Sequence, residues 1–362
     1  MKKRMANMEL LRIVAMMMVV LLHYLSKGAF LSPLTGEMQT NGYVAWLMEA
    51  FAIVAVNVYM LLSGYFLVES GFRLGRLVEL VCQVLFYTVM VPVVLVVCGI
   101  LPVGDITVYQ ILQYVFPTQM LHYWFVSAYI LMYLFVPILS AGAKALSQKQ
   151  LQITIALLIA VLAVSKSLIP VKLELDNLGY DAIWFMCVFL VAAYIRLYGI
   201  PFFDRMSKGI ICYVCAALAI FAGALGVRAL YLKTGSLGDF IQATYSYNHI
   251  FVLFASVALF YAFYYLQISA ESKFGKFVCK ISPYTFGVYL LHEQVEVRWL
   301  WPTWLGADPG ETVGMMIFRA LCAVQVVFAV GICVDGVRGY LFGVVKRIWR
   351  KTSLYARLCS KK

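Results

Sequence analysis

Residues 77–101 read LVELVCQVLFYTVMVPVVLVVCGIL, and this stretch decides the fold class of the chain. It contains a single charged side chain, Glu79, and its apolar positions are continuous rather than alternating. A helix of this length is about 37 Å long, which is enough to cross the roughly 30 Å hydrocarbon core of a bilayer. Strands of a membrane barrel would alternate between apolar and polar positions. The stretch therefore predicts a transmembrane helix.

Further runs of the same kind occur along the whole chain. Each has the roughly 20 mostly apolar residues that a spanning helix needs. They cover residues 9–26, 44–68, 121–142, 151–169, 182–199, 209–227, 247–268, 283–300 and 313–335. The run at 283–300 is the least regular, because it contains two glutamates and an arginine. We expect an all-α polytopic membrane protein with about ten transmembrane helices and no separate soluble domain.

The composition supports a membrane protein and argues against a soluble or nucleic-acid-binding one. Of the 362 residues, 64% are hydrophobic and 13% are charged. Soluble domains carry roughly 45–50% apolar and about 25% charged residues. The net charge of +12 could suggest nucleic acid, but the basic residues lie in short clusters between the apolar runs. Such clusters are typical of the charge asymmetry that orients membrane proteins.

The distribution of basic residues predicts the topology. With the N-terminus in the cytoplasm and ten spans, 22 of the 29 Lys and Arg residues lie inside, six lie outside, and Arg319 falls in the last span. Cytoplasmic loops carry such an excess. We expect both termini in the cytoplasm and a multi-pass protein of the cell membrane, the inner membrane of a bacterium. Residues 1–337 form the predicted membrane domain. Residues 338–362 form a basic cytoplasmic tail, predicted to lie with Trp349, Tyr355 and Leu358 on the anionic inner leaflet.

Arg12 and His23 are the first polar residues within a predicted span. They are 11 positions apart, so both lie on one face of a helix, separated by roughly 16 Å along its axis. Charged groups inside a membrane are costly and commonly functional. Histidine is the side chain best suited to accept a proton near neutral pH. In the alternative interpretation, Arg12 is an anchor at the inner surface and His23 is an interfacial residue.

Two further groups allow both a functional and a structural interpretation. Arg73 and Arg76 form an R-x-x-R at a helix start, where paired guanidinium groups could bind phosphates or could serve only to set topology. His292, Glu293 and Glu296 lie close together in the run 283–300. Glu293 and Glu296 share a helical face, and a carboxylate could orient the imidazole. Alternatively, residues 292–298 lie at the outer membrane–water interface, where a charged side chain costs little free energy.

The chain offers no strong motif for a metal or nucleotide site. Its four histidines, His23, His122, His249 and His292, show no H-x-x-x-H spacing, and no Walker or Rossmann glycine pattern is present. We therefore expect no metal. Cys212 and Cys215 form a C-x-x-C within an apolar run, without a second pair or a nearby histidine. Buried free cysteines behave as small hydrophobic residues, and we expect these two to be apolar filler.

Four stretches, taken in order, resemble the membrane acyltransferase family 3, polytopic enzymes that O-acylate surface sugars. Span one carries the R-x10-H pair, Arg12 and His23. The stretch from Asn57 to Phe66 resembles the aromatic run that leads into S-G-Y-F, with Ser63 and Tyr65, and the R-x-x-R follows. The other two stretches are His122-Tyr123-Trp124-Phe125, followed by Tyr129, Tyr133 and Pro137, and the segment from Gly287 to His292. The resemblance extends over nearly the whole chain.

The resemblance implies an O-acetyltransferase mechanism. An acyl-CoA, usually acetyl-CoA, would bind from the cytoplasm with its phosphates on Arg73 and Arg76, and its pantetheine arm would enter a cavity between helices. His23 would act as general base on a hydroxyl of a surface glycan or lipid-linked sugar, or would carry the acyl group itself. Arg12 would stabilise negative charge or position the donor.

The remaining site candidates have less specific roles. Glu293 matches no family motif. It is a catalytic candidate only because its carboxylate lies beside His292 in the sequence. Asn57, Ser63, Tyr65, Trp124 and His292 are candidates for substrate contact or structural support. The expected partners are the glycan acceptor and membrane lipids, without nucleic acid.

Two rival functions fit a ten-helix chain. A transporter or flippase of glycan units would also place charges inside the membrane. It has no need of paired arginines on one side and a histidine in the other half of the bilayer. A sensor or scaffold without chemistry predicts that His23 can be replaced without loss.

Overall fold

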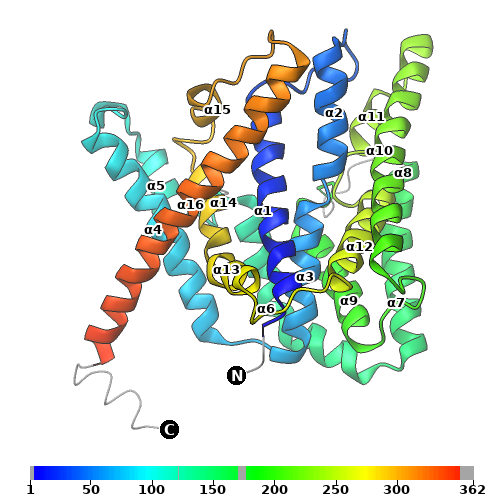
Figure 1. The fold of residues 1–362 in the computed structure, drawn as a ribbon, viewed down its shortest axis with the longest axis horizontal. Helices are drawn as coiled ribbons and strands as arrows, with labels where there is room; N and C mark the ends of the chain where they lie inside the picture. Colours follow the sequence, from blue (N-terminus) through cyan, green and yellow to red (C-terminus); the bar gives the residue numbers. More distant parts are fainter. Residues whose placement is uncertain (1–3, 121, 170–176, 351–362) are drawn as a thin grey trace.

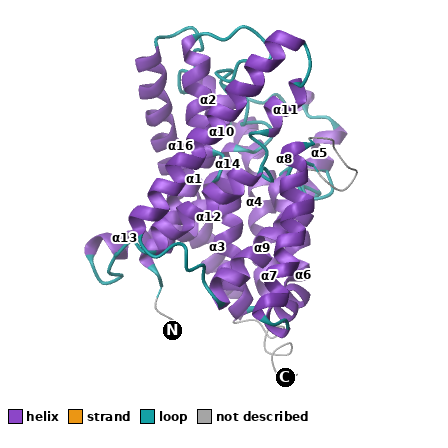
Figure 2. Ribbon diagram, turned by 90° about the vertical axis from the view of Figure 1, so that its right-hand side faces the viewer, coloured by secondary structure: helices purple, strands orange, loops and turns teal. Residues whose placement is uncertain are grey.

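The structure is a computed structural model that describes residues 4–120, 122–169 and 177–350. Within these ranges the chain consists of helices and loops, without strands (Figure 2). The first half contains α1 (Ala6–Lys27), α2 (Thr40–Ala52), α3 (Ala55–Ser70), α4 (Leu74–Val97), η1 (Val103–Asp105), α5 (Val108–Val115), α6 (Trp124–Ala145), α7 (Gln148–Ile159), the π-helical turn η2 (Ala160–Val164) and α8 (Ser165–Leu168). The second half contains α9 (Ala182–Leu197), α10 (Met206–Thr234), α11 (Gly238–Ala243), α12 (Ile250–Tyr264), α13 (Lys273–Ile281), η3 (Ser282–Tyr284), α14 (Thr285–His292), α15 (Trp301–Trp304) and α16 (Val313–Arg350).

The prediction of an all-α polytopic membrane protein is confirmed. Seven helical stretches of the described chain are long and apolar enough to cross a membrane: Ala6–Lys27, Thr40–Ser70, Leu74–Val97, Trp124–Ala145, Gln148–Leu168, Met206–Thr234 and Val313–Ile348. Two shorter apolar helices, Ala182–Leu197 and Ile250–Tyr264, correspond to two further predicted spans. The predicted count of ten and the placement of both termini in the cytoplasm stay predictions.

The run at 283–300 does not form the single continuous helix that the sequence suggested. Its helix α14 ends at His292, and the chain then passes through turns to α15. The backbone N–H of Val295 donates to Nε2 of His122, 3.2 Å away, so the turn has a partner outside its own helix. After the helix end, the side chain of Glu296 also finds partners in the bundle, because it accepts hydrogen bonds from Tyr114 and Gln110 on α5.

Helix α1 lies in the middle of the molecule, with α14 and α16 on one side and α2 and α3 on the other (Figure 1). The beginning of α1 and the end of α16 lie at the same end of the molecule, which we call the N-terminal end (Figure 1). The segment from α13 to α15 leads from this end toward the opposite one (Figure 1). A central α1 brings both Arg12 and His23 into the interior of the bundle.

Helices α14 and α16 approach each other closely because glycine lies at their crossing. A Cβ atom added to Gly331 would lie 2.7 Å from Cα of Val288, and one added to Gly287 would collide with the side chain of Asp335. Small residues allow such close approach between membrane helices. The position of α14, which carries His292, is therefore fixed against α16.

Asp335 is a fully buried carboxylate that joins α16 to α4. Its Oδ1 atom accepts hydrogen bonds from Gln83 and Tyr87, each at 3.0 Å, while Arg338 binds both of its oxygens at 2.6 and 2.9 Å. Every acceptor on a buried carboxylate needs such partners, since an uncompensated charge there is strongly destabilising.

The end of α16 passes the predicted boundary at residue 337 without a break and continues to Arg350. The division into a membrane domain and a tail stays a prediction. The side chain of Trp349, together with Tyr355 and Leu358, lies outside the described part of the chain. Cys212 and Cys215 are free thiols on α10, and nothing further distinguishes them from apolar filler.

Candidate active site

His23 and His292 face each other across the interior. Nδ1 of His23 lies 2.9 Å from Nε2 of His292, and the same Nδ1 lies 3.3 Å from Oε1 of Glu293. The first histidine comes from the last turns of α1 and the second from the last turn of α14. The structure thus brings together three of the residues that the sequence singled out, although the two histidines are 269 positions apart.

The hydrogen bonds of the two rings determine which nitrogens carry protons. Nδ1 of His292 lies 2.6 Å from the carbonyl oxygen of Val288. A carbonyl oxygen only accepts, so Nδ1 of a neutral His292 carries the proton and its Nε2 is left as an acceptor. His23 must then donate from Nδ1, which leaves its Nε2 unprotonated. That nitrogen has no hydrogen-bond partner among the described residues, and it is the atom that could accept a proton from a substrate.

Lys27 completes the charges around the histidines. It lies one helical turn after His23 and forms an ion pair with Glu293, and each side chain is only 10% exposed. Lys27 is not among the site residues predicted from the sequence, where it counts only as one of the six basic residues expected outside. The spacing of four residues from His23, which places both on one face of α1, was the signal that could have identified it.

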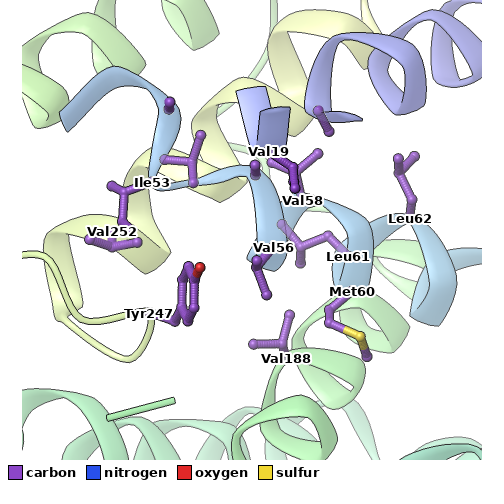
Figure 3. Packing of buried hydrophobic residues seen from close by; sticks show 14 of the residues in the cluster. Val19, Ile53, Val56, Val58, Met60, Leu61, Leu62, Val188, Tyr247 and Val252 are labelled. Carbon is purple, nitrogen blue, oxygen red and sulfur yellow. The ribbon is translucent and has the colours of Figure 1, made fainter. Parts of the chain in front are cut away.

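An apolar pocket, which we call the histidine pocket, lies next to His23. Its lining residues come from α1, α3, α6, α14 and the loop before α12: Met16, Val19, Leu22, His23, Val56, Tyr59, Trp124, Phe125, Tyr247, Phe286 and Tyr289. Figure 3 shows Val19, Val56 and Tyr247 among the buried residues of this region. Most of the lining side chains are apolar, and the side chain of His23 is 19% exposed.

A much larger cavity of about 1800 Å³, the arginine cavity, lies between α1, α3, α4, α6 and the end of α16. Seven cationic residues line it: Arg4, Arg12, Arg73, Arg76, Arg196, Arg338 and Lys346. The acidic residues of its lining are Glu9, Glu69 and Glu79, so its walls carry an excess of positive charge. Arg73 and Arg76 both face this cavity, and their positions fit a site for an anionic ligand.

Arg12 lies in the wall of the arginine cavity, away from His23. It forms an ion pair with Glu9, whose Oε2 accepts a hydrogen bond of 2.6 Å from Ser282. Tyr59 donates to the backbone oxygen of Arg12 at 3.0 Å. Arg12 and His23 therefore lie on the same helix but line different cavities, Arg12 the arginine cavity and His23 the histidine pocket.

Aromatic side chains of α6 form a stripe between the two cavities. The rings of Phe125, Tyr129 and Tyr133 are stacked with centroid separations of 6.0 and 6.2 Å. Tyr129 and Tyr133 line the arginine cavity, while Phe125 lines the histidine pocket. The hydroxyl of Tyr133 accepts a hydrogen bond of 3.0 Å from the backbone N–H of Arg73. The stripe therefore leads from the arginines toward His23.

The supporting residues occupy distinct positions. Asn57 is buried and lines neither cavity, but it lies behind the histidine pocket, where its Oδ1 accepts from Nε1 of Trp184 at 2.9 Å and its Nδ2 donates to the carbonyl of Tyr247, a lining residue, at 2.8 Å. Trp124 lines the histidine pocket and stacks on Tyr247 at 5.7 Å.

Ser63 and Tyr65 line the arginine cavity. The hydroxyl of Tyr65 accepts a hydrogen bond of 3.0 Å from Arg196. The roles assigned to these residues from the sequence stay predictions.

Glu296 does not share the site of His292 and Glu293, as helical spacing had suggested. Its Oε1 accepts hydrogen bonds from Tyr114 at 2.5 Å and Gln110 at 3.1 Å, both on α5. The expected common face disappears because the helix ends at His292, so residues 293–296 no longer follow a helical repeat. His122 is likewise structural, since its Nδ1 donates to the carbonyl of Gln113 at 3.3 Å and its Nε2 accepts from Val295.

The ligand atoms of His23, His292 and Glu293 lie within 4.8 Å of one another, a spacing compatible with a metal ion. Their side-chain nitrogens and oxygen already serve as partners for each other and for Lys27. A test for H-x-x-x-H spacing cannot detect such a group, because its members come from different helices. The prediction that the site uses no metal stays a prediction.

Comparison with known proteins gives one match. A family model described as "Acyltransferase domain" matches residues 5–334, nearly the whole chain. No curated protein and no solved structure matches the chain. The matched range contains the histidine pocket, and it ends just before Asp335 and Arg338.

Proposed function

Because this chain belongs to the membrane acyltransferase family 3, we propose that it moves an acyl group from acyl-CoA to a hydroxyl of a surface or exported glycan. The proposed acyl group is acetyl, because this is the group that members of the family usually transfer. The proposed activity is therefore that of an integral membrane O-acetyltransferase. The observation that carries this proposal is the His23–His292 pair, which leaves one unprotonated imidazole nitrogen beside an apolar pocket. A neutral imidazole in such a position is suited to general base catalysis.

The arginine cavity supports the binding of an acyl-CoA donor. Coenzyme A carries a pyrophosphate and a ribose phosphate, which are anionic and demand cationic partners. Guanidinium groups bind phosphate oxygens in bidentate fashion, and Arg73 and Arg76 are two of the exposed cations in this cavity. Its volume of about 1800 Å³ exceeds the 300–1,000 Å³ of ordinary ligand pockets, so a molecule as large as coenzyme A can enter.

The aromatic stripe supports a path for the pantetheine arm. From Tyr133 to Phe125 there are eight helical residues, which correspond to about 12 Å along α6. The pantetheine arm is narrow, and it can follow these rings from the arginines to the histidine pocket, with the tyrosine hydroxyls of the stripe available to its amide groups. The thioester would then reach His23 from the N-terminal end, and the glycan would approach from the opposite side of the membrane.

The transfer step requires little beyond the groups already described. The acceptor hydroxyl gives its proton to Nε2 of His23 while its oxygen attacks the thioester carbonyl carbon. The new C–O bond forms, the C–S bond breaks, and the departing thiolate takes the proton from the imidazolium. Glu293, with its Oε1 at 3.3 Å from Nδ1 of His23, lies close enough to help hold the ring in its orientation during this step.

A covalent route uses the same atoms in two steps. Nε2 of His23 attacks the thioester carbonyl carbon, so that the C–N bond forms and the C–S bond breaks, and the departing thiolate takes the proton that the acyl-imidazolium gives up. The acceptor oxygen then attacks the acyl carbon, the C–N bond breaks, and the hydroxyl proton returns to the imidazole. Both routes need the tautomer in which Nδ1 of His23 carries the proton. The proposal therefore holds for either order of events.

The decisive experiment follows the acyl group. Membranes that contain the protein are mixed with acetyl-CoA labelled on the acetyl group and with host glycan, and the label is followed into alkali-labile ester. We expect label in the glycan with the native chain and none with His23→Ala. His249→Ala serves as a matched control, because His249 is a buried histidine at the N-cap of α12 that lines neither cavity.

Two outcomes would contradict the proposal. Transfer by His23→Ala at the native rate would remove the base from the mechanism. A native chain that neither transfers label nor binds acyl-CoA would instead support a transporter, which has no need of the donor.

A further inference from the structure

Tyr289 carries a buried hydroxyl group that has no hydrogen-bond partner among the described residues. The residue is 5% exposed, lies on α14 about one turn before His292, and lines the histidine pocket. Of the polar side-chain atoms buried without a partner in the described chain, this hydroxyl is the one that belongs to the lining of that pocket. A hydroxyl that loses its bonds to water without a replacement costs free energy. A catalytic role is one of the explanations for such a group.

The ring of Tyr289 lies beside the ring of His23, and both line the same pocket. Their centroids are 6.4 Å apart. The two rings offer complementary chemistry, because Nε2 of His23 can accept a proton whereas a phenol O–H can donate a hydrogen bond. A reacting group in the pocket can therefore meet a base and a hydrogen-bond donor at once. Acyl transfer needs this combination, with the donor directed at the carbonyl oxygen.

The beginning of α6 adds positive partial charge at the same place. Trp124 and Phe125 are the first two residues of this helix, both line the pocket, and no side chain of the described residues caps the helix N-terminus. The N–H groups of a first helical turn have no partner within the helix and carry partial positive charge. The N–H of Phe125 lies close to the hydroxyl oxygen of Tyr289 without a hydrogen bond of normal geometry. An N–H beside the oxygen leaves the hydroxyl proton available to another acceptor.

Neighbouring rings hold Tyr289 in place. The ring of Tyr123 is 5.6 Å away, that of Phe125 5.8 Å and that of Phe286 6.0 Å. A side chain packed in this way cannot turn its hydroxyl far from its position. Since no bond within the described chain occupies this hydroxyl, none has to break before it can bind a substrate. Donors that are fixed in advance in this way are the effective ones in stabilising a transition state.

We propose that Tyr289 is a catalytic residue whose hydroxyl donates a hydrogen bond to the carbonyl oxygen of the thioester and stabilises the oxyanion formed during acyl transfer. This inference rests on the proposed function. When the acceptor oxygen, or Nε2 of His23 in the covalent route, attacks the carbonyl carbon, the carbonyl oxygen gains negative charge. The hydrogen bond from Tyr289 strengthens as this charge develops. When the C–S bond breaks, the C=O bond forms again, and the phenol keeps its proton throughout.

The test removes the hydroxyl and keeps the ring. For the native chain and Tyr289→Phe, we would measure kcat, the KM values for acetyl-CoA and for the glycan, and the unfolding temperature of the purified protein. Tyr24→Phe is the matched control. Tyr24 is fully buried and its hydroxyl also lacks a partner among the described residues, but it lines neither cavity.

We expect Tyr289→Phe to lower kcat by about 10²- to 10³-fold, which is the effect of removing one oxyanion donor, and to leave both KM values unchanged. Tyr24→Phe should keep the native kcat. The unfolding temperature should stay the same or rise in both variants, because each loses a buried hydroxyl without a partner.

Three results would overturn the inference and leave the proposed function intact. The first is a native kcat in Tyr289→Phe. The second is a loss of kcat together with a lower unfolding temperature, which would make the hydroxyl structural. The third is a higher KM for the glycan at the native kcat, which would place the hydroxyl in the acceptor site. Absence of transfer by the native chain would overturn the proposed function itself, and the inference with it.

Discussion

Nδ1 of His23 and Nε2 of His292 are 2.9 Å apart, and this contact makes the ring of His292 a support for the ring of His23. The support continues to the backbone, since His292 is itself fixed by the carbonyl of Val288 at 2.6 Å. These two consecutive contacts, from the Val288 carbonyl to His292 and from His292 to His23, determine both the orientation and the tautomer of the His23 ring. His292 is thus a positioning residue that acts through His23.

Replacing His292 with alanine should lower kcat without raising the KM for acyl-CoA. The loss of the Nδ1 partner frees the ring of His23 to rotate and to protonate at Nε2. We expect a decrease of about 10- to 100-fold, a part of the 10²–10⁴ that a general base contributes. His292→Gln, whose amide oxygen can accept from His23, should recover some of the rate. An equal loss in both variants, or a loss expressed in KM, would contradict a positioning role.

Removing the arginines of the R-x-x-R should weaken donor binding. Arg73→Ala and Arg76→Ala should each cost about 1.5–3 kcal/mol if a charge-assisted bond to phosphate is lost, which corresponds to about 10- to 150-fold in Kd. The measurement is a titration of the purified protein with acetyl-CoA at fixed salt. Lys144→Ala is the control, because this exposed lysine at the end of α6 does not line the arginine cavity. Unchanged affinity in the arginine variants would restrict those residues to setting topology.

The crossing of α14 and α16 predicts a sharp difference between two glycines. A methyl group at Gly287 would collide with Asp335, so Gly287→Ala should destabilise the protein by about 1–3 kcal/mol. Gly336 lies on the same helix as Asp335, and a Cβ there meets nothing within 4 Å. Gly336→Ala should therefore be neutral or stabilising by up to about 1 kcal/mol. Thermal unfolding of the purified variants tests this, and equal effects would argue against the close crossing.

The C-x-x-C of α10 should be dispensable. Cys212 and Cys215 are free thiols that line neither cavity. We expect the double variant Cys212→Ser with Cys215→Ser to insert in the membrane and to transfer the acyl group at the native rate. Loss of activity in that variant, with normal amounts of protein in the membrane, would show that the pair has a chemical role.

Local patterns in the sequence predicted the helices well, because each span is a continuous apolar segment whose length alone is informative. The shared face of Arg12 and His23 was also predictable, since helical geometry fixes it. The partnership of His23 with His292 was not, because it depends on how α1 and α14 pack, and no local pattern encodes that packing.

The errors have the same origin. Extending the helix beyond His292 placed Glu296 beside the histidine, whereas the chain turns and Glu296 binds Tyr114 on α5. Apolar composition does not show where a helix ends when polar side chains find partners in other helices. The contribution of Arg338 and Lys346 to the arginine cavity was missed for a related reason, since a basic stretch after the last apolar run resembles a surface tail.

The lining of the arginine cavity has a consequence for how variants of this protein are interpreted. Arg73, Arg76, Arg196, Arg338 and Lys346 line the cavity, and they are also among the residues whose positive charge is expected to retain their loops in the cytoplasm during insertion. The proposed ligand binding and the expected membrane orientation thus depend on one set of side chains. Neutralising several of them at once could invert a hairpin as well as abolish binding. Any multiply substituted chain therefore needs its orientation established before a loss of activity is attributed to the site.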